Sequence, residues 1–373
     1  MNKVLMTAST YSHIRNFHLP YLREFQRLGW ETHVVCRDIP ADAPYIDKAI
    51  DLPFEKKMQS PENFRAAHKL RRLIQTERYD LIITHTSLAA FFTRLAARGT
   101  NGRLVNVVHG YLFDDDTPLL KRAILLTAEC LTAPQTDLLL TMNAWDYKTA
   151  VKYRLGRQIA MVPGMGVDTS RLDHASPEAG IRLRRDLGIS SDAFVLLFAA
   201  EFSERKSQHT LIEALTRLPQ NVTLVLCGAG ATLEACRTLA DKLGVSGRVL
   251  FPGQVADMSV WYRIADAAVT SSRSEGLPFN VIEAMHCGLP VVASAVKGHT
   301  DLIDNSVTGL LYPYGDADAC AAQVMRLIND FTLRERIREQ GRENVTVYEL
   351  DAVLPQVMTL YLGAESTLQY KKK

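Results

Sequence analysis

Two glutamates, Glu275 and Glu283, lie eight residues apart around the point where a predicted strand is followed by a predicted helix. The strand is the apolar run 267–270, and the helix is expected to begin at Pro278 and to end at Gly288. The amide N–H groups of a loop and helix start of this kind point out of a positive helix end, where an anion binds. The spacing therefore predicts an anion site with two carboxylates facing the ligand. For either Glu taken alone, an alternative interpretation remains: an acidic residue near a helix N-terminus also stabilises the helix.

Two further strands are predicted at 81–84 and 104–108. A histidine comes directly after each of them, His85 after the first and His109 after the second. Ligands of open α/β sheets bind at the carboxyl ends of the strands, so both side chains are candidates for contact with a ligand. A structural role is the alternative for each. His13 lies in the loop after the first strand, and a hydrogen-bonded loop histidine is the default interpretation there.

The acidic run 114–116 raises the question of a metal ion. It precedes Thr117 and Pro118, which favours acids in a solvated loop at a helix start. We therefore expect no metal site.

Strand and helix patterns alternate along the whole chain. The opening has a strand at 4–7, a helix at 16–28 that Gly29 stops, and a strand at 32–36, which together predict a parallel sheet. A length of 373 residues favours two domains. We place the boundary in the segment 163–168, whose two glycines allow a hinge.

The composition is that of an ordinary globular protein, with 47% hydrophobic and 23% charged residues. No run reaches the ~18 apolar residues of a membrane span, and the N-terminus does not have the pattern of a signal peptide. The six cysteines are scattered, as buried reduced thiols of a cytoplasmic protein are.

Charge is distributed unevenly between the two halves. Residues 1–165 hold 22 Lys and Arg against 16 Asp and Glu, whereas residues 166–373 hold 21 against 25. The helix predicted from Ser60 to Thr76, with an apolar stripe at Phe64, Ala67, Leu70 and Ile74, lies in the basic run 56–72. That run is interpreted as a solvated helix face or, alternatively, as a contact with anionic lipid. Its single aromatic residue, Phe64, belongs to the predicted apolar stripe, so aromatic residues for base stacking are missing and we expect no nucleic acid partner. The apolar helix 119–133 is expected to be buried, with an interfacial helix as the alternative.

The segment from Glu275 to Val292, E-G-L-P-F-N-V-I-E-A-M-H-C-G-L-P-V-V, resembles the donor-binding signature of the retaining glycosyltransferase family 4. The resemblance implies that Glu283 binds the ribose of a nucleotide sugar and that Glu275 binds hydroxyls of the sugar. It also implies that the backbone between them meets the diphosphate, through Gly276, Leu277, Pro278, Phe279 and Asn280.

Other positions resemble the family more loosely. His109 with Gly110 is similar to a His-Gly pair whose imidazole lies near the transferred sugar, and Lys206 matches a lysine that grips the diphosphate. Glu201 stands where relatives have a second cation, so Arg205 is the candidate to replace it. Gly228 and Gly230 resemble the Gly-x-Gly turn beneath the nucleotide.

The family resemblance implies the GT-B architecture: an α/β protein of two doubly wound Rossmann-like domains that face each other across a cleft. The N-terminal domain, 1–167, is expected to bind the acceptor, and the C-terminal domain, 168–349, the nucleotide sugar. A last helix at about 350–367 is expected to return to the first domain.

The implied activity is hexosyl or N-acetylhexosaminyl transfer with retention, from a UDP-sugar to a lipid-linked or glycan acceptor, with no metal or other cofactor. Similarity to cell-surface, capsular and exopolysaccharide glycosyltransferases points to a polyprenyl-diphosphate-linked glycan as the acceptor. The protein is then cytoplasmic, with peripheral contact at the inner face of the cytoplasmic membrane. Two alternatives remain: a sugar-nucleotide epimerase of the same architecture, and a catalytically inactive sugar-nucleotide-binding subunit.

Overall fold

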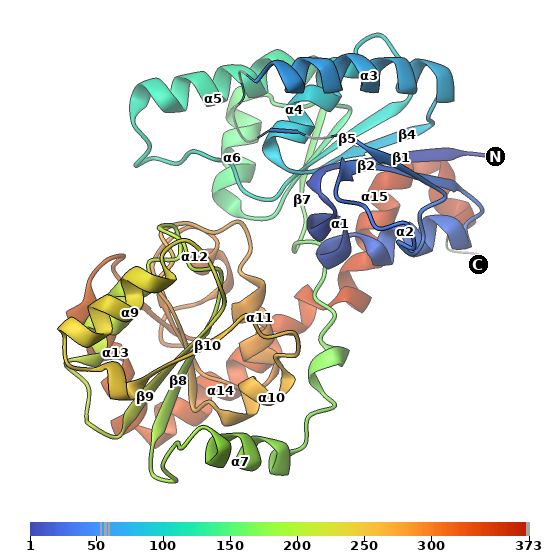
Figure 1. Ribbon diagram of the computed structural model, residues 1–373. Helices are drawn as coiled ribbons and strands as arrows, with labels where there is room; N and C mark the ends of the chain where they lie inside the picture. The colour runs from blue at the N-terminus through green and yellow to red at the C-terminus, as the bar shows by residue number, and fades with distance from the viewer. Residues whose placement is uncertain (53, 56–57, 59, 371–373) are drawn as a thin grey trace. The chain divides into compact units, whose positions relative to one another are not determined.

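The computed structural model describes residues 1–52, 54, 55, 58 and 60–370, and it divides the chain into two compact units (Figure 1). Unit 1 comprises Met1–Gly166 and Asp351–Lys373, and unit 2 comprises Val167–Leu350. Each unit is a parallel sheet covered by helices on both faces, which is the α/β fold predicted from the sequence. None of the described helices is long and apolar enough to cross a membrane.

The sheet of unit 1 has seven strands in the order β3-β2-β1-β4-β5-β6-β7. Its strands are β1 (Lys3–Thr10), β2 (Glu31–Arg37), β3 (Lys48–Asp51), β4 (Leu81–Thr84), β5 (Arg103–Val108), β6 (Leu138–Thr141) and β7 (Gln158–Met161). The central strand β4 is buried at every position, as its unbroken apolar sequence requires. The short edge strand β3 has a single large apolar residue, Ile50, and sequence patterns did not predict it.

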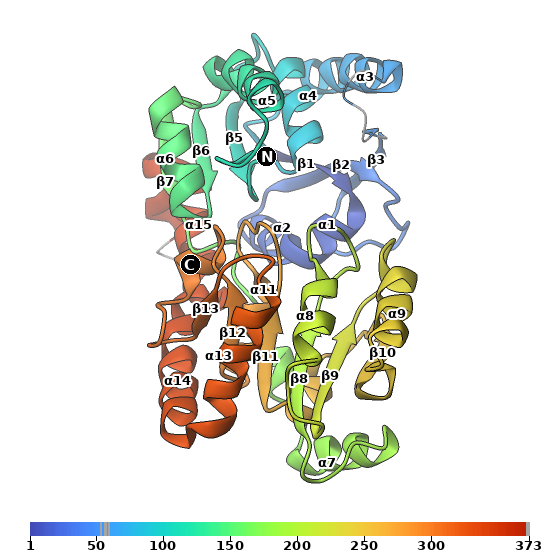
Figure 2. The same ribbon diagram turned by 90° about the vertical axis from the view of Figure 1, so that its left-hand side faces the viewer.

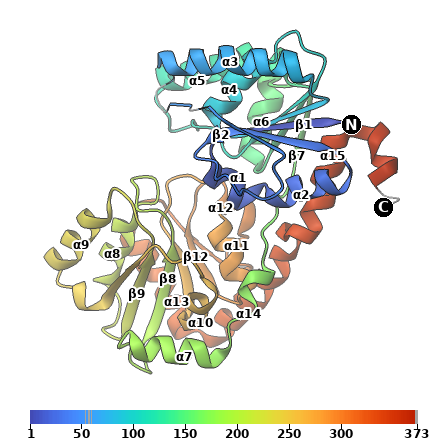
Figure 3. The same cartoon turned by 45° about the vertical axis from the view of Figure 1, so that its right-hand side comes forward.

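Helices cover both faces of this sheet. They are α1 (Tyr11–Phe17), α2 (Leu19–Arg27), α3 (Pro61–Glu77), α4 (Ser87–Ala96), α5 (Leu119–Thr132), α6 (Ala144–Tyr153) and α15 (Leu350–Tyr370). Helix α15 lies beside α2 (Figure 3), where the Tyr361 ring packs on Tyr21 and Phe25 with centroid separations of 5.8 and 6.3 Å. Arg103 at the start of β5 donates a 2.8 Å hydrogen bond to the Leu360 carbonyl. These contacts hold the C-terminal helix on unit 1.

Three local expectations about unit 1 were wrong. The helix expected at 16–28 is two helices, because the chain enters α1 directly from β1 and breaks at His18, two residues before Pro20. In α3 the buried face includes Asn63, whose side chain bonds the Glu55 backbone, whereas Phe64 is 59% exposed. Helix α5 was expected to be buried, but only Thr132 of its residues is.

Unit 2 has six strands in the order β10-β9-β8-β11-β12-β13, and their labels follow this order across Figure 2. They are β8 (Phe194–Ala199), β9 (Val222–Cys227), β10 (Val249–Gly253), β11 (Ala267–Thr270), β12 (Val291–Ser294) and β13 (Leu310–Tyr312). Successive side chains of a strand point to opposite faces. Accordingly, Leu196 and Phe198 of β8 belong to one core, and Val195 and Leu197 to the other.

Helices α8 (Gln208–Leu215), α9 (Leu233–Lys242) and α13 (Ala317–Asn329) contribute to the first of these cores, together with α14 (Phe331–Asn344). Helices α10 (Ser259–Ile264) and α11 (Phe279–His286) contribute to the second, against which α7 (Pro177–Asp186) packs. The short helices η2 (Ser170–Leu172) and α12 (His299–Leu302) lie in loops.

The order of the strands reverses once in each sheet. In unit 1 the strands run outward from β1 and β4, and in unit 2 from β8 and β11. Loops that leave the carboxyl ends of such a strand pair diverge and leave a crevice where ligands bind. Of the candidate residues, Arg205, Lys206 and 275–278 lie on the loops of unit 2 that leave β8 and β11. Gly228 and Gly230 follow β9, and His109 follows β5.

Candidate active site

Two loops of unit 2 are tied together at the reversal point of its sheet. The loop after β8 carries Arg205 and Lys206, and the loop after β11 leads into α11. The Arg273 amide donates to the Arg205 carbonyl at 2.7 Å, and the Ser271 hydroxyl donates to the Lys206 carbonyl at 2.9 Å. Backbone hydrogen bonds therefore fix the two basic residues against the second loop.

Glu275 receives both of these cations. Its Oε1 lies 2.5 Å from Lys206 Nζ, and its Oε2 lies 2.8 Å from an Arg205 guanidinium nitrogen. Burial disfavours a charged carboxylate, but Lys206 and Arg205 outweigh it and lower the pKa of Glu275 to about 2. Lys206 is 9% exposed and Glu275 7%, so the pair is an ionised and nearly buried cluster.

A third segment closes on Glu275 from the loop after β12. The Glu275 amide donates to the Lys297 carbonyl at 3.2 Å, and Gly298 has φ +83°. A Cβ at Gly298 would lie 2.8 Å from the Glu275 Cβ, so only glycine allows this approach. The neighbouring His299 is fully buried, and burial lowers its pKa to about 4.

Glu283 is held by a different set of partners. Its Oε1 accepts a hydrogen bond from Arg171 of η2, and its Oε2 accepts one of 2.8 Å from the Tyr262 hydroxyl of α10. Burial raises the pKa of Glu283 above its ordinary value, although Arg171 and Tyr262 oppose the shift. The carboxylate is thus oriented from two sides before any ligand binds.

Glu283 also lines a cavity of ≈ 380 Å³ at the carboxyl ends of β8 and β9. The wall includes Glu201 from the loop after β8, Gly228 from the turn after β9, and Asn280 from the first turn of α11. Gln254 and Val255 close it on the side of β10. The cavity brings together the loops of three neighbouring strands and the start of a helix.

The glycines of the turn after β9 allow that turn to pack on the loop after β8. Gly228 and Gly230 have φ +147° and +152°. A Cβ at Gly228 would lie 1.9 Å from the Ala200 carbonyl oxygen, and one at Gly230 would lie 2.2 Å from that of Phe202. Gly228 lines the cavity, whereas Gly230 shapes the turn from outside its wall.

The loop residues predicted from the motif lie where α11 begins. Pro278 is the residue before the helix and Phe279 is its first residue, one position later than expected. Gly276, Leu277 and Pro278 connect Glu275 to that helix start. The structure thus brings nine of the twelve predicted residues to the loops after β8 and β11 and to the start of α11, and it places Gly228 and Gly230 on the adjoining turn after β9.

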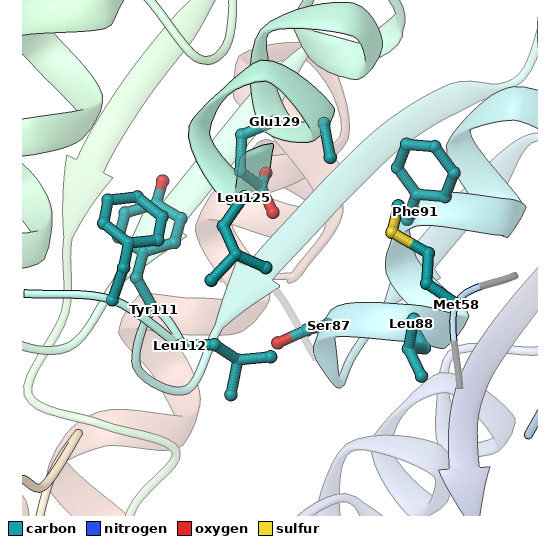
Figure 4. A pocket seen from close by; sticks show the side chains of 10 residues that line it. Met58, Ser87, Leu88, Phe91, Tyr111, Leu112, Leu125 and Glu129 are labelled. Carbon is teal, nitrogen blue, oxygen red and sulfur yellow. The ribbon is translucent and has the colours of Figure 1, made fainter. Parts of the chain in front are cut away.

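His109, the remaining predicted residue, belongs to unit 1, where it follows β5. It lines a small cavity of ≈ 40 Å³ together with Ser87, Asn106 and Glu129. An apolar pocket of similar volume shares Ser87 and Glu129 with this cavity. Figure 4 shows Leu112 and Leu125 directed into the pocket, with Leu88 and Phe91 of α4 across from them.

The acidic run of unit 1 has other partners than a metal ion. Asp114 accepts from the Thr117 hydroxyl at 2.7 Å, and Asp115 accepts from the Trp145 indole at 2.8 Å and pairs with Arg122 at 3.0 Å. These contacts agree with acids in a solvated loop.

Sequence reasoning missed Arg171 and Tyr262, which orient Glu283. Arg171 lies 112 residues from Glu283, and no periodicity or motif links the two. Only the position of Arg171, three residues after the predicted domain crossing at Asp168, offered a signal. His13, expected to be a loop residue, lies in α1 and in contact with His109, with 3.3 Å between their Nε2 atoms.

Comparison with known families places both units. Residues 21–171 match the family model Glycosyltransferase Family 4, and residues 181–344 match the model Glycosyl transferases group 1. The two matches cover the strands of both sheets from β2 to β13, and the second contains Glu275 and Glu283.

Relatives of full length agree with this assignment. The chain is 32% identical over 368 residues, 96% of each chain, to the putative glycosyltransferase EpsD of Bacillus subtilis (strain 168). It is 22% identical over 381 residues, 95% of this chain and 98% of the relative, to UDP-Gal:alpha-D-GlcNAc-diphosphoundecaprenol alpha-1,3-galactosyltransferase of Escherichia coli.

Solved structures share the fold. Anabaena Alr3699/HepE, solved in complex with UDP-glucose, is 20% identical with a TM-score of 0.79, covering 96% of this chain and 99% of that one. WaaG, a glycosyltransferase involved in lipopolysaccharide biosynthesis, is 19% identical with a TM-score of 0.74, covering 97% and 100%. The predicted GT-B fold is therefore confirmed, and the chain belongs to the family 4 glycosyltransferases.

Proposed function

We propose that the chain transfers a sugar, with retention of configuration, from a UDP-sugar to a lipid-linked glycan in the synthesis of a cell-surface polysaccharide. The observation that carries the proposal is the cavity of unit 2, where Glu283 and the start of α11 meet the turn at Gly228. Carboxylates accept ribose hydroxyls, and amides at a helix start accept phosphate oxygens. Arg205 and Lys206 stand on the next loop as diphosphate ligands.

Donor binding on this proposal exchanges partners inside the site. Glu275 now neutralises Arg205 and Lys206, and a bound diphosphate competes for the same two cations. The Glu275 carboxylate is then freed to accept hydroxyls of the sugar. Glu283 similarly exchanges Arg171, which is half-exposed, for the ribose. The departing UDP is stabilised by the two cations, so this donor chemistry requires no metal on the diphosphate.

Glu201 is the feature of the cavity that fits a diphosphate least well. Its carboxylate stands where related enzymes carry a cation, and it lines the cavity as an exposed negative charge. Arg205 replaces the missing cation in this proposal. The inactive sugar-nucleotide-binding subunit is the second candidate function because of this one residue.

The acceptor side of the proposal rests on α5 and the pocket beneath it. Leu120, Ile124 and Leu131 share one face of α5 and are 77%, 56% and 63% exposed. On the opposite face of α5, Leu125 and Glu129 line the apolar pocket. Glu129 also lines the cavity that His109 lines. A lipid anchor in the pocket therefore places its glycan end toward His109.

We propose that α5, with Lys121 on its flank, contacts the anionic inner face of the cytoplasmic membrane. Exposed apolar side chains beside a basic residue complement a surface of acyl chains and anionic headgroups. The Escherichia coli relative is named for transfer to a diphosphoundecaprenol-linked sugar, which supports an acceptor of this class.

The test is incubation of the full chain with a panel of UDP-sugars, with and without a membrane lipid extract. Release of UDP that depends on the extract, with the sugar recovered in the lipid phase, is the expected result. UDP and an altered free sugar without extract would instead identify an epimerase. Binding of a UDP-sugar without any turnover would identify an inactive subunit.

A further inference from the structure

Four histidines of unit 1 converge at the reversal point of its sheet. His13 lies in α1, His18 between α1 and α2, His85 after β4 and His109 after β5. Strands β1, β4 and β5 are neighbours in the sheet, so their carboxyl ends bring these segments together. One ring nitrogen of each histidine lies within 4.8 Å of the corresponding nitrogen of every other.

Two of the nitrogen–nitrogen distances match those of ligands around a tetrahedral ion. His109 Nε2 lies 3.3 Å from His13 Nε2 and 3.3 Å from His85 Nδ1. Two nitrogens that each bind a tetrahedral zinc at about 2.0–2.1 Å are about 3.3–3.4 Å apart. The ring centroids agree: five of the six pairs are separated by 4.5–6.0 Å, close to the ~5 Å of imidazoles that share such an ion.

The cluster contains buried nitrogens without a partner. Among the described residues, neither ring nitrogen of His18 has a hydrogen-bond partner, and neither does His85 Nε2. Both side chains are fully buried. A buried polar atom without a partner is unfavourable by about 1–3 kcal/mol, and an ion bound to one of the two His18 nitrogens would remove that penalty for the bound atom.

The protonation state suits a metal. Burial lowers the pKa of all four imidazoles, that of His13 to about 4, and each of His18, His85 and His109 lies beside other imidazoles that lower its pKa further. Neutral imidazole is the form that binds metal ions.

We infer that His13, His18, His85 and His109 form a binding site for a divalent transition-metal ion, of which zinc is the best match. A set of four nitrogen ligands, two of whose spacings match a tetrahedron, favours zinc, and imidazole ligands also accept copper and nickel. The rings of His18 and His85 are stacked at 3.6 Å. Metal binding opens this stack, because two rings on one ion cannot lie so close. All four ligands belong to unit 1, whereas the cations proposed for the diphosphate belong to unit 2.

The inference changes the role open to His109. An ion on its Nε2 leaves only Nδ1 for contact with a substrate. The inference does not depend on the donor or on the proposed transfer reaction, because the ligands and their spacing all belong to unit 1.

The experiment uses the untagged full chain, stripped with a chelator and then titrated with Zn²⁺ against a chromophoric competitor. The wild type is expected to bind one zinc per chain. X-ray absorption at the zinc edge is expected to report a nitrogen shell at about 2.0–2.1 Å. His18→Ala and His13→Ala are each expected to weaken zinc binding by at least about tenfold, since even loss of a supporting contact has that effect. His68→Ala, an exposed histidine of α3, is the matched control and is expected to bind as the wild type does.

Circular dichroism and thermal melting establish that each variant is folded, and His13→Ala keeps the test valid if the fully buried His18 is needed for folding. Zinc is also expected to raise the melting midpoint of the wild type and of His68→Ala, but not of His13→Ala. Equal zinc affinity of the wild type and folded His13→Ala would overturn the inference. The cluster would then be a set of hydrogen-bonded and stacked imidazoles only.

Discussion

Glu275 and Glu283 differ in the partners that a bound ligand would have to replace. Glu275 holds two cations that a diphosphate also attracts, whereas Glu283 holds one arginine and one tyrosine hydroxyl. The pKa of Glu275 is lowered to about 2, so its carboxylate is ionised at neutral pH. Burial raises the pKa of Glu283, which brings this carboxyl nearer to protonation. The two side chains therefore differ in partners and in charge state, although the motif spaces them as a pair.

Glu283→Gln is expected to weaken UDP binding by about 2 kcal/mol, or about thirtyfold in Kd, because ribose hydroxyls lose a charged acceptor. The matched control is Glu201→Gln, which changes another carboxylate of the same cavity. It is expected to leave UDP affinity unchanged or to increase it, since a charge that repels the diphosphate is removed. Calorimetry with UDP measures both. Equal affinities of the two variants and the wild type would remove Glu283 from the ribose.

Glu275 is expected to stabilise unit 2 in a pH-dependent way. Its pKa is depressed from 4.5 to about 2, so its contribution is present above about pH 4.5 and is lost as the pH falls toward 2. Glu275→Gln is expected to reduce the free energy of unfolding by about 3 kcal/mol at pH 7, because Lys206 stays buried without its partner. Denaturant unfolding at pH 7 and at pH 3 should show this difference shrinking at the lower pH.

Glu204→Gln serves as the control, because Glu204 is an exposed carboxylate on the same loop. A deficit of Glu275→Gln that stays constant between the two pH values would contradict the ion-pair account.

The residues of the proposed donor site could be predicted where a motif is local. Glu275, Glu283 and the start of α11 lie within one short segment, and their types state their chemistry. Arg171 and Tyr262 could not be predicted, because they reach Glu283 only through the packing of η2 and α10 on α11. The same holds for the four histidines, which four separate segments supply.

Among the elements, the turn after β9 depends most strictly on its sequence. Gly228→Ala is expected to destabilise unit 2 by more than about 2 kcal/mol, because the new Cβ would meet the Ala200 carbonyl and alanine disfavours φ +147°. Gly247→Ala is the control, since nothing lies within 4 Å of its Cβ position and its φ is not positive. It is expected to change stability by less than about 0.5 kcal/mol. Thermal unfolding of the two variants tests this prediction. Similar melting midpoints would mean that the turn accommodates the new Cβ without a loss of stability.

Helix α5 is the element whose environment the sequence predicted incorrectly. Its apolar residues surround the helix, and such a pattern is typical of a buried helix. In unit 1 only one side of α5 packs on the protein, and Leu120, Ile124 and Leu131 remain exposed. Sequence patterns report that a face is apolar but do not report what covers it.

Replacement of Leu119, Leu120 and Ile124 by Ser is expected to reduce binding to anionic vesicles by on the order of a hundredfold, at ~1 kcal/mol or more for each side chain. The comparison variant replaces Lys69, Arg71 and Arg72 of α3 by Gln. We expect it to lose less vesicle binding, because Arg71 already donates a hydrogen bond to the Arg98 carbonyl. Lys56 and Lys57 lie outside the described residues. A sedimentation assay measures both variants, and a greater loss from the α3 set would transfer the membrane contact to the basic run.

At the scale of the molecule, the two units repeat one arrangement. Each sheet reverses its strand order once, and each reversal carries a cluster of ionisable side chains: carboxylates with cations in unit 2, imidazoles in unit 1. The alternation of strands and helices predicted both sheets, because buried parallel strands have a clear apolar pattern. It could not predict that His18 interrupts the first helix, since that break depends on local backbone geometry before Pro20.

The central claim is that the cavity of unit 2 binds a UDP-sugar whose sugar leaves for a lipid-linked acceptor. The most direct measurement follows radiolabel from a UDP-sugar into the lipid phase of a membrane extract, for the wild type and for Lys206→Gln. The wild type is expected to transfer label only when extract is present. Lys206→Gln is expected to be slower by on the order of a hundredfold, because one charge on the departing diphosphate is lost. Transfer by Lys206→Gln at the wild-type rate, or no transfer by the wild type from any UDP-sugar, would contradict the account.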